Sequence, residues 1–155
     1  MTRAQACEWA PAGWVPVFAG VVVGSAVVSP LALHGWFLLL DWVGGPELRL
    51  PPSMYGMGAV GASVPLQLLV DGLGLVVGRP AMQWLPVAAF FPVAMWSAGR
   101  LVGGERVTPR LAAGLLYAVN PFVFERLGAG QVFVLLGYAI LPAFARSLLD
   151  ANFSK

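Results

Sequence analysis

The stretch GWVPVFAGVVVGSAVVSPLAL, residues Gly13 to Leu33, decides the fold class, because it carries no charged side chain. An α-helix rises about 1.5 Å per residue, so about 20 apolar residues cross a hydrocarbon core of roughly 30 Å. The stretch is therefore predicted to be a membrane-spanning helix. Arg3 is the only basic residue before it, and no A-x-A sequence follows it cleanly. We expect an uncleaved first span, with a cleaved signal peptide as the alternative.

The composition of the whole chain indicates the same class of protein. Hydrophobic residues make up 59% of the 155 residues and charged residues only 10%, with a mean hydropathy of +0.80. Soluble domains carry about 25% charged residues, so this chain has too few to cover a water-facing surface. Its formal net charge of +2 is too small and too scattered to suggest nucleic acid as a partner. Cys7 is the single cysteine, which excludes an internal disulfide.

Three further apolar stretches follow, at residues 80–98, 111–124 and 131–145. The first of them contains Pro86 and Pro92, which a membrane helix tolerates where neighbouring helices satisfy the carbonyls that lose a donor. The other two are about 21 to 23 Å long, shorter than the hydrocarbon core. The sequence thus predicts an all-α membrane domain with four transmembrane helices.

The polar sequence NPFVFERLGAGQ, residues 120–131, connects the last two predicted spans. Pro121 lacks an amide proton and disfavours a helical conformation at Asn120. The glycines later in the stretch permit a turn. We expect a tight reversal at or just inside the membrane surface, with Glu125 and Arg126 either beside a pocket or among lipid headgroups.

One segment, residues 59–78, leaves the topology open, because it is almost long enough to span but carries Asp71, a proline and several glycines. If it spans, the arginine-rich stretch 99–110 lies outside, against the tendency of short cytoplasmic loops to collect Arg and Lys. If it lies along the outer surface, residues 34–79 form one large external loop with an interfacial helix at about 64–77. Both termini are then cytoplasmic, and we favour this arrangement. Its cytoplasmic basic residues are Arg3, Arg100, Arg106, Arg110, Arg146 and Lys155, and its external ones are Arg49, Arg79 and Arg126.

The predicted external loop contains acidic candidates for chemistry. Asp41 follows the first span and lies near Trp36 and Trp42, a residue type that anchors at membrane interfaces. One interpretation is an ordinary charge at a helix end. The other is a general base, or a ligand for a divalent cation, that acts on a lipid-linked substrate. Asp71 lies in an apolar stretch, where an ionisable residue is costly unless the helix lies at the interface.

Several kinds of site are excluded by the residues present. His34 is the only histidine, so a His-based metal cluster or a Cys–His pair cannot form. The chain contains no Walker loop, no G-x-S-x-G and no H-E-x-x-H sequence. Gly20 and Gly24, four residues apart, indicate helix packing. We therefore expect no resident cofactor.

Three stretches of the sequence belong together: WFLLLDWVGGP (36–46), VPLQLLVDGLG (64–74) and LLYAVNPFVFERLGAGQVFVLLGYAILP (115–142). Together they resemble the amino-terminal part of bacterial GT-C glycosyltransferases, in particular actinobacterial arabinosyl- and mannosyltransferase-like membrane proteins. The likeness covers residues 13 to about 148. Its most specific part is the series N-P-F, E-R, G-x-G-Q and Y-x-x-x-P in the last of the three.

The resemblance implies a bacterial plasma-membrane enzyme of cell-envelope synthesis that moves a sugar from a polyprenyl phosphate donor to an acceptor on the outer face. Members of the family carry seven or more spans, and the paired acids typical of many are absent here. We therefore expect an incomplete enzyme that is inactive alone. The alternatives are a truncated or split gene product, a fragment, and a small paralogue whose further helices come from a membrane-protein partner. The resemblance places Asp41 in the position of the first-loop catalytic acid and Asp71 near the sugar donor. Near the pocket wall it places Asn120, Glu125, Arg126 and Gln131.

The alternative is a small non-catalytic membrane protein that scaffolds or assists a larger membrane complex, in which Asp41 and the charged turn are structural. A transporter is less favoured, because the predicted spans lack an ionisable residue at mid-depth. An enzyme predicts that Asp41 and Glu125 face one outward cavity. A scaffold predicts that the two carboxylates diverge into the headgroup region.

Overall fold

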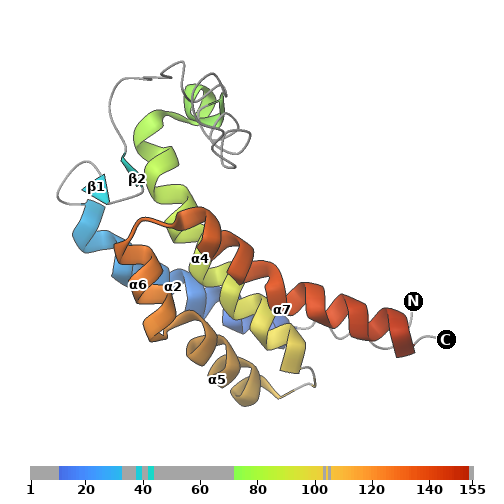
Figure 1. Ribbon diagram of the computed structural model, residues 1–155. Helices are drawn as coiled ribbons and strands as arrows, with labels where there is room; N and C mark the ends of the chain where they lie inside the picture. Colours follow the sequence, from blue (N-terminus) through green and yellow to red (C-terminus); the bar gives the residue numbers. More distant parts are fainter. Residues whose placement is uncertain are drawn as a thin grey trace.

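The computed structural model describes residues 11–32, 38–39, 42–43, 72–102, 104 and 106–153. In these ranges the chain is helical, as predicted, apart from one antiparallel pair of two-residue strands. Figure 1 shows the longer helices packed against one another. The elements are α2 (Pro11–Ala32), β1 (Leu38–Leu39), β2 (Trp42–Val43), α4 (Arg79–Val102), α5 (Val107–Ala118), α6 (Pro121–Gly128) and α7 (Val132–Phe153).

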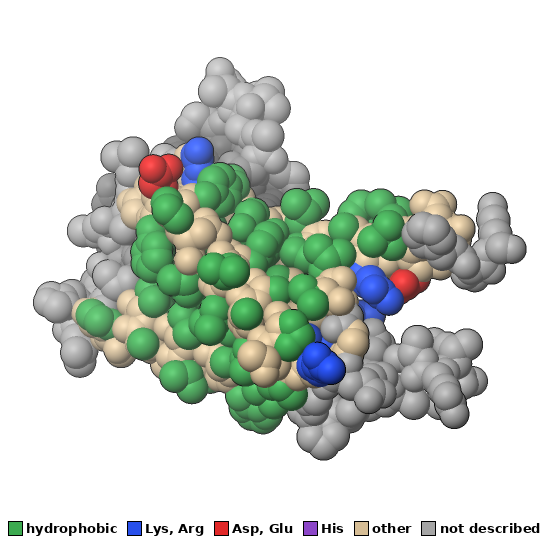
Figure 2. Space-filling model, turned by 90° about the horizontal axis from the view of Figure 1, so that it is seen from below, with side chains coloured by type: hydrophobic (Ala, Val, Ile, Leu, Met, Phe, Trp, Pro, Cys, Tyr) green, Lys and Arg blue, Asp and Glu red, His purple; other side chains and the backbone are tan. Residues whose placement is uncertain are grey.

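Three of the described helices are long and apolar enough to cross a membrane. The qualifying segments are Gly13–Pro30 in α2, Trp84–Val102 in α4 and Val132–Asn152 in α7. Large apolar side chains such as Phe18 and Phe144 are more than half exposed on these helices. Figure 2 shows hydrophobic side chains spread over the face it presents, with few charges among them. Such a surface suits lipid rather than water.

The long helices agree with the apolar pattern of the sequence. The predicted spans 13–33 and 80–98 coincide with α2 and α4. Helix α7 begins where the span 131–145 was predicted but continues beyond it. The extension carries Arg146 and Asp150, whose side chains form an ion pair of 3.1 Å one turn apart.

The third predicted span, 111–124, is wrong as a continuous helix. α5 ends at Ala118 and α6 begins at Pro121. Asn120 between them is extended, with φ −142° and ψ 163°, because the ring of the following proline disfavours a helical conformation. The predicted reversal at residues 120–131 consequently contains a helix of its own.

Most of the predicted external loop, residues 34–79, lies outside the described residues. Residues 72–77 are helical, in agreement with the last part of the predicted interfacial helix at 64–77. The short strand pair, in which Leu38 lies opposite Val43, was not predicted. The topology of this segment relative to a membrane stays a prediction.

Helices α2 and α4 are antiparallel and in close contact. A Cβ added at Gly20 would overlap the backbone of Pro92, and one added at Gly24 would lie 3.2 Å from the carbonyl oxygen of Ala88. Two glycines one helical turn apart therefore let the two backbones approach, as the four-residue spacing predicted.

Helix α4 is central, since it packs against α2, α5 and α7. Gly114 of α5 lies on Met95, and Gly99 lies beside Arg110, so α5 runs antiparallel to α4. The Ser97 hydroxyl donates a hydrogen bond to the carbonyl of Ala139 in α7. We call the end of the bundle where α2 and α5 begin and α4 and α7 end the basic end (Figure 1), because it carries Arg100, Arg106, Arg110 and Arg146.

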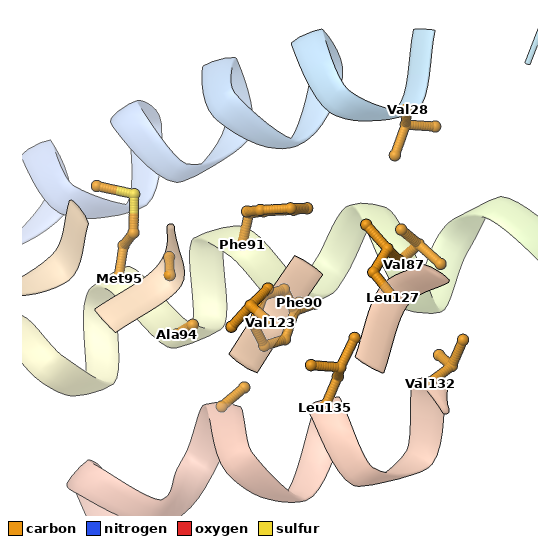
Figure 3. Packing of buried hydrophobic residues seen from close by; sticks show 12 residues of the cluster. Val28, Val87, Phe90, Phe91, Ala94, Met95, Val123, Leu127, Val132 and Leu135 are labelled. Atoms are coloured by element: carbon orange, nitrogen blue, oxygen red, sulfur yellow. The ribbon is translucent and has the colours of Figure 1, made fainter. Parts of the chain in front are cut away.

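The core lies between α4 and the helices around it. Figure 3 shows Val28 of α2 on one side of α4 and Leu135 of α7 on the other. Phe90 and Phe91 are fully buried, with ring centroids 5.0 Å apart in an edge-on arrangement. Their large aromatic surfaces fill the layer between the helices. Leu127 at the end of α6 belongs to the same cluster, so the core also holds the short helix in place.

Helices α5 and α6 together carry the chain from the basic end to the other end. Their lengths are about 18 Å and about 12 Å, since they have 12 and 8 residues. α5 begins beside Gly99 at the end of α4. α6 ends where Leu127 and Val132 join the cluster around Val87, near the start of α4. The two short helices thus cover a path about as long as one of the longer helices.

Candidate functional site

The break between α5 and α6 is organised by the side chain of Asn120. Its Oδ1 accepts a hydrogen bond of 3.1 Å from the backbone N–H of Val123, which caps the N-terminus of α6. Pro121 occupies the first position of this helix, where no donor is needed. The Nδ2 group donates to the Tyr117 carbonyl at 2.7 Å and to the Tyr138 hydroxyl at 3.2 Å. One amide side chain therefore caps a helix and joins α5 to α7.

Across this break, Tyr117 and Tyr138 each donate a hydrogen bond from the side-chain hydroxyl to the other's backbone carbonyl. Pro121 and Pro142 lack the N–H groups that would bond the carbonyls of Tyr117 and Tyr138 four residues earlier. The Tyr117 hydroxyl donates to the Tyr138 carbonyl at 2.7 Å, and the Tyr138 hydroxyl donates to the Tyr117 carbonyl at 3.3 Å. Their rings stack with centroids 4.2 Å apart. The two hydroxyl groups thus replace the two N–H donors that the prolines lack.

The other end of α6 closes with a Schellman motif. Gly130 has φ +77°, which glycine adopts without strain, and its N–H donates to Leu127 at 3.0 Å. The N–H of Gln131 donates to the Arg126 carbonyl at 2.9 Å. The side chains of the same two residues also meet, since Arg126 donates to Oε1 of Gln131 at 2.6 Å. The guanidinium lies 5.4 Å from the centre of the Phe122 ring.

The predicted site residues divide into three groups. Asn120, Arg126 and Gln131 make contacts within their own turn or with α7. Glu125 is exposed on α6, and in the described part of the chain its side chain has no ion pair or hydrogen bond. Asp41 and Asp71 lie outside the described residues, so a site shared by Asp41 and Glu125 stays a prediction. No group of three metal-binding side chains occurs among the described residues.

The tyrosine pair was missed when the sequence was interpreted. The signal was present as a repeated pentapeptide, YAVNP at 117–121 and YAILP at 138–142. A tyrosine four residues before a proline has a carbonyl that no helical N–H can reach. Two such carbonyls in one membrane domain require two external donors. The repeat could have predicted that the two segments pair.

Comparison of the chain with protein-family models, with curated proteins and with solved structures gave no match in any of the three. The resemblance to GT-C glycosyltransferases therefore stays a prediction. What the described residues establish is a helical fold with three helices that suit a membrane.

The reciprocal tyrosine bonds predict an energetic coupling between Tyr117 and Pro142. Tyr117→Phe should destabilise the protein by about 1 to 2 kcal/mol, because the Tyr138 carbonyl loses its donor. In a Pro142→Ala background the helix regains an N–H at residue 142, so Tyr117→Phe should cost about 1 kcal/mol less. Unfolding of the purified protein in detergent, followed by circular dichroism, measures both costs. Pro86→Ala is the matched control background. If the cost of Tyr117→Phe fell there as much as in the Pro142→Ala background, the coupling would be contradicted.

Proposed function

We propose that the chain is an integral membrane module that crosses the bilayer four times, with α5 and α6 together forming the third crossing. The support is that these two helices run between the same two ends of the bundle as α2, α4 and α7. Basic residues favour the cytoplasmic side, so the basic end faces the cytoplasm of a bacterial cell and both termini lie there. Asn120 is then near the middle of the third crossing, deeper than the sequence predicted.

The module serves as a packing unit in a larger membrane assembly rather than as an enzyme by itself. The observation that carries this proposal is the engagement of Asn120, Arg126 and Gln131 in capping and helix-to-helix contacts. These polar side chains have structural partners, so they are not held ready for a substrate. The exposed apolar faces of the long helices suit lipid or further helices equally.

The second candidate is the glycosyltransferase-like function, in which the assembled protein takes a sugar from a polyprenyl phosphate. One observation favours it. Glu125 is an exposed carboxylate near the end of the bundle where α2 ends, and Asp41 follows α2 by a short connection. In the four-crossing arrangement both acids belong to the outer side. Carboxylates at that side are suited to general-base chemistry or to holding a divalent cation.

The four-crossing arrangement is tested by cysteine accessibility in intact cells. Cys7→Ser removes the only native thiol, and single cysteines then replace Thr108 at the start of α5 and Gly128 at the end of α6, both of which are exposed. A membrane-impermeant maleimide should label position 128 from outside and position 108 only after permeabilisation. Equal labelling of both positions from one side would mean that α5 and α6 do not cross.

The two candidate functions differ in which substitutions matter. If the chain is a packing module, Asp41→Asn and Glu125→Gln should leave both the amount of protein and the cell-envelope glycans of the source cell unchanged. If it is part of a glycosyltransferase, Asp41→Asn should reduce a glycan at least about tenfold while the protein level stays constant. Glycan analysis with a quantitative immunoblot separates the outcomes. A loss of glycan in Asp41→Asn at normal protein level would rule out the purely structural role.

A further inference from the structure

We propose that Arg110 binds the phosphate group of an anionic phospholipid at the basic end of the bundle. The inference goes beyond the proposed function, and it rests on that proposal only in placing this end at the bilayer surface. It is carried by one buried arginine side chain without a partner, by its position in the first turn of a helix and by the charges around it.

The Arg110 side chain is buried without a partner. Its residue is 9% exposed, and its Nε atom is enclosed with no hydrogen bond. No hydrogen bond or ion pair of this side chain occurs in the part of the chain that the structure describes, whereas Arg146 is paired with Asp150. The two terminal nitrogens also have no partner but are not fully enclosed, so the guanidinium reaches the surface with part of its charge removed from water. An anion at this point would supply the counter-charge that the described residues do not.

The position of Arg110 provides further donors for such an anion. It lies in the first turn of α5, packed beside Gly99 at the end of α4. A helical side chain leans toward the N-terminus of its own helix, which directs the Arg110 side chain toward the first amides of α5. The N-cap residue, Arg106, provides no side-chain cap for them. Free amides and the positive end of the helix dipole both favour an anion there.

The surroundings favour a lipid phosphate over other anions. Arg100 and Arg106 lie at the same end, and the Asp150 carboxylate there is held by Arg146. Basic pockets between membrane helices on the cytoplasmic side are typical sites for phosphate headgroups. A guanidinium matches two phosphate oxygens with two parallel N–H donors. The C-terminal carbonyls of α4 are the competing acceptors, yet Arg110 donates no hydrogen bond to them within the described residues.

Lipid retention by the purified full-length chain tests the proposal. The protein in neutral detergent is incubated with phosphatidylglycerol, with phosphatidylcholine or with inorganic phosphate, and examined by native mass spectrometry and thermal unfolding. We expect retained phosphatidylglycerol and a rise in melting temperature of about 4 °C, and neither effect with phosphatidylcholine. An equal rise with inorganic phosphate would overturn the lipid as the source of the anion.

Variants then assign the site to Arg110. Arg110→Gln should retain about tenfold less phosphatidylglycerol, while Arg106→Gln, which removes the same charge from an exposed neighbour, should reduce the retention much less. Arg110→Lys keeps the positive charge and should retain an intermediate amount, so it provides a test even if the glutamine variant does not fold. Unchanged retention in both Arg110 variants, or an equal loss in Arg106→Gln, would overturn the proposal.

Discussion

Gly20→Ala should destabilise the bundle more than any other single methyl group added to a described helix. The new Cβ would lie 2.7 Å from the backbone nitrogen of Pro92 and 2.8 Å from the carbonyl oxygen of Phe91. Both are backbone atoms, so no side-chain rotation can relieve the overlap and α2 must move away from α4. Overpacking of this kind costs about 3 kcal/mol. Thermal unfolding in detergent micelles, followed by circular dichroism, measures the loss.

Gly137→Ala is the matched control for this prediction. A Cβ at Gly137 meets nothing within 4 Å, and the residue is exposed within α7. Alanine has the higher helix propensity, so this variant should be unchanged or more stable by up to about 1 kcal/mol. If Gly20→Ala and Gly137→Ala unfold at the same temperature, the close contact of α2 and α4 does not exist in the folded protein.

Asn120→Ala should also have a large effect, about 2 kcal/mol. Alanine removes the cap that Oδ1 gives to the Val123 N–H. It also removes the Nδ2 donor from the carbonyl of Tyr117, which Pro121 already deprives of its helical partner. Two buried or half-buried groups thus lose bonds through one substitution. The same unfolding measurement applies.

Asn120→Asp tests how deep this side chain lies. Aspartate keeps an oxygen that can cap α6, but it cannot donate to the Tyr117 carbonyl or to the Tyr138 hydroxyl. A carboxylate near the middle of a membrane crossing is also costly. We therefore expect Asn120→Asp to destabilise the protein more than Asn120→Ala does. An aspartate variant more stable than the alanine variant would mean that residue 120 does not lie at mid-depth.

The long helices could be predicted from the sequence because hydrocarbon thickness sets a length that an apolar stretch either reaches or does not. This argument located α2 and α4, and it located the start of α7. It ended α7 too early, since Arg146 was taken as a boundary although its ion pair with Asp150 is compatible with a helix. It also merged α5 and α6, because the span was delimited by its apolar length and not by the proline within it.

Sequence reasoning singled out the polar residues between α5 and α7, and only the fold shows which contacts they make. Asn120, Arg126 and Gln131 were expected near a pocket wall, as the family resemblance implied. In the fold Asn120 caps α6 and bonds Tyr138, and Arg126 bonds Gln131. A polar residue at a predicted turn satisfies a cap as readily as it binds a ligand, so its type does not distinguish the two roles.

The features that depend on residues close together along the chain could be predicted from the sequence alone. The apolar length of α2, the interruption at Asn120 and Pro121, and the glycine that ends α6 all follow from residues within one or two helical turns. The contacts between helices depend on how each helix is rotated and how far apart the helices lie, and only the packed fold shows this. The pairing of Tyr117 with Tyr138 and the burial of Arg110 against α4 join segments distant in sequence. Packing between helices fixes such contacts, and no single helix contains the information that selects them.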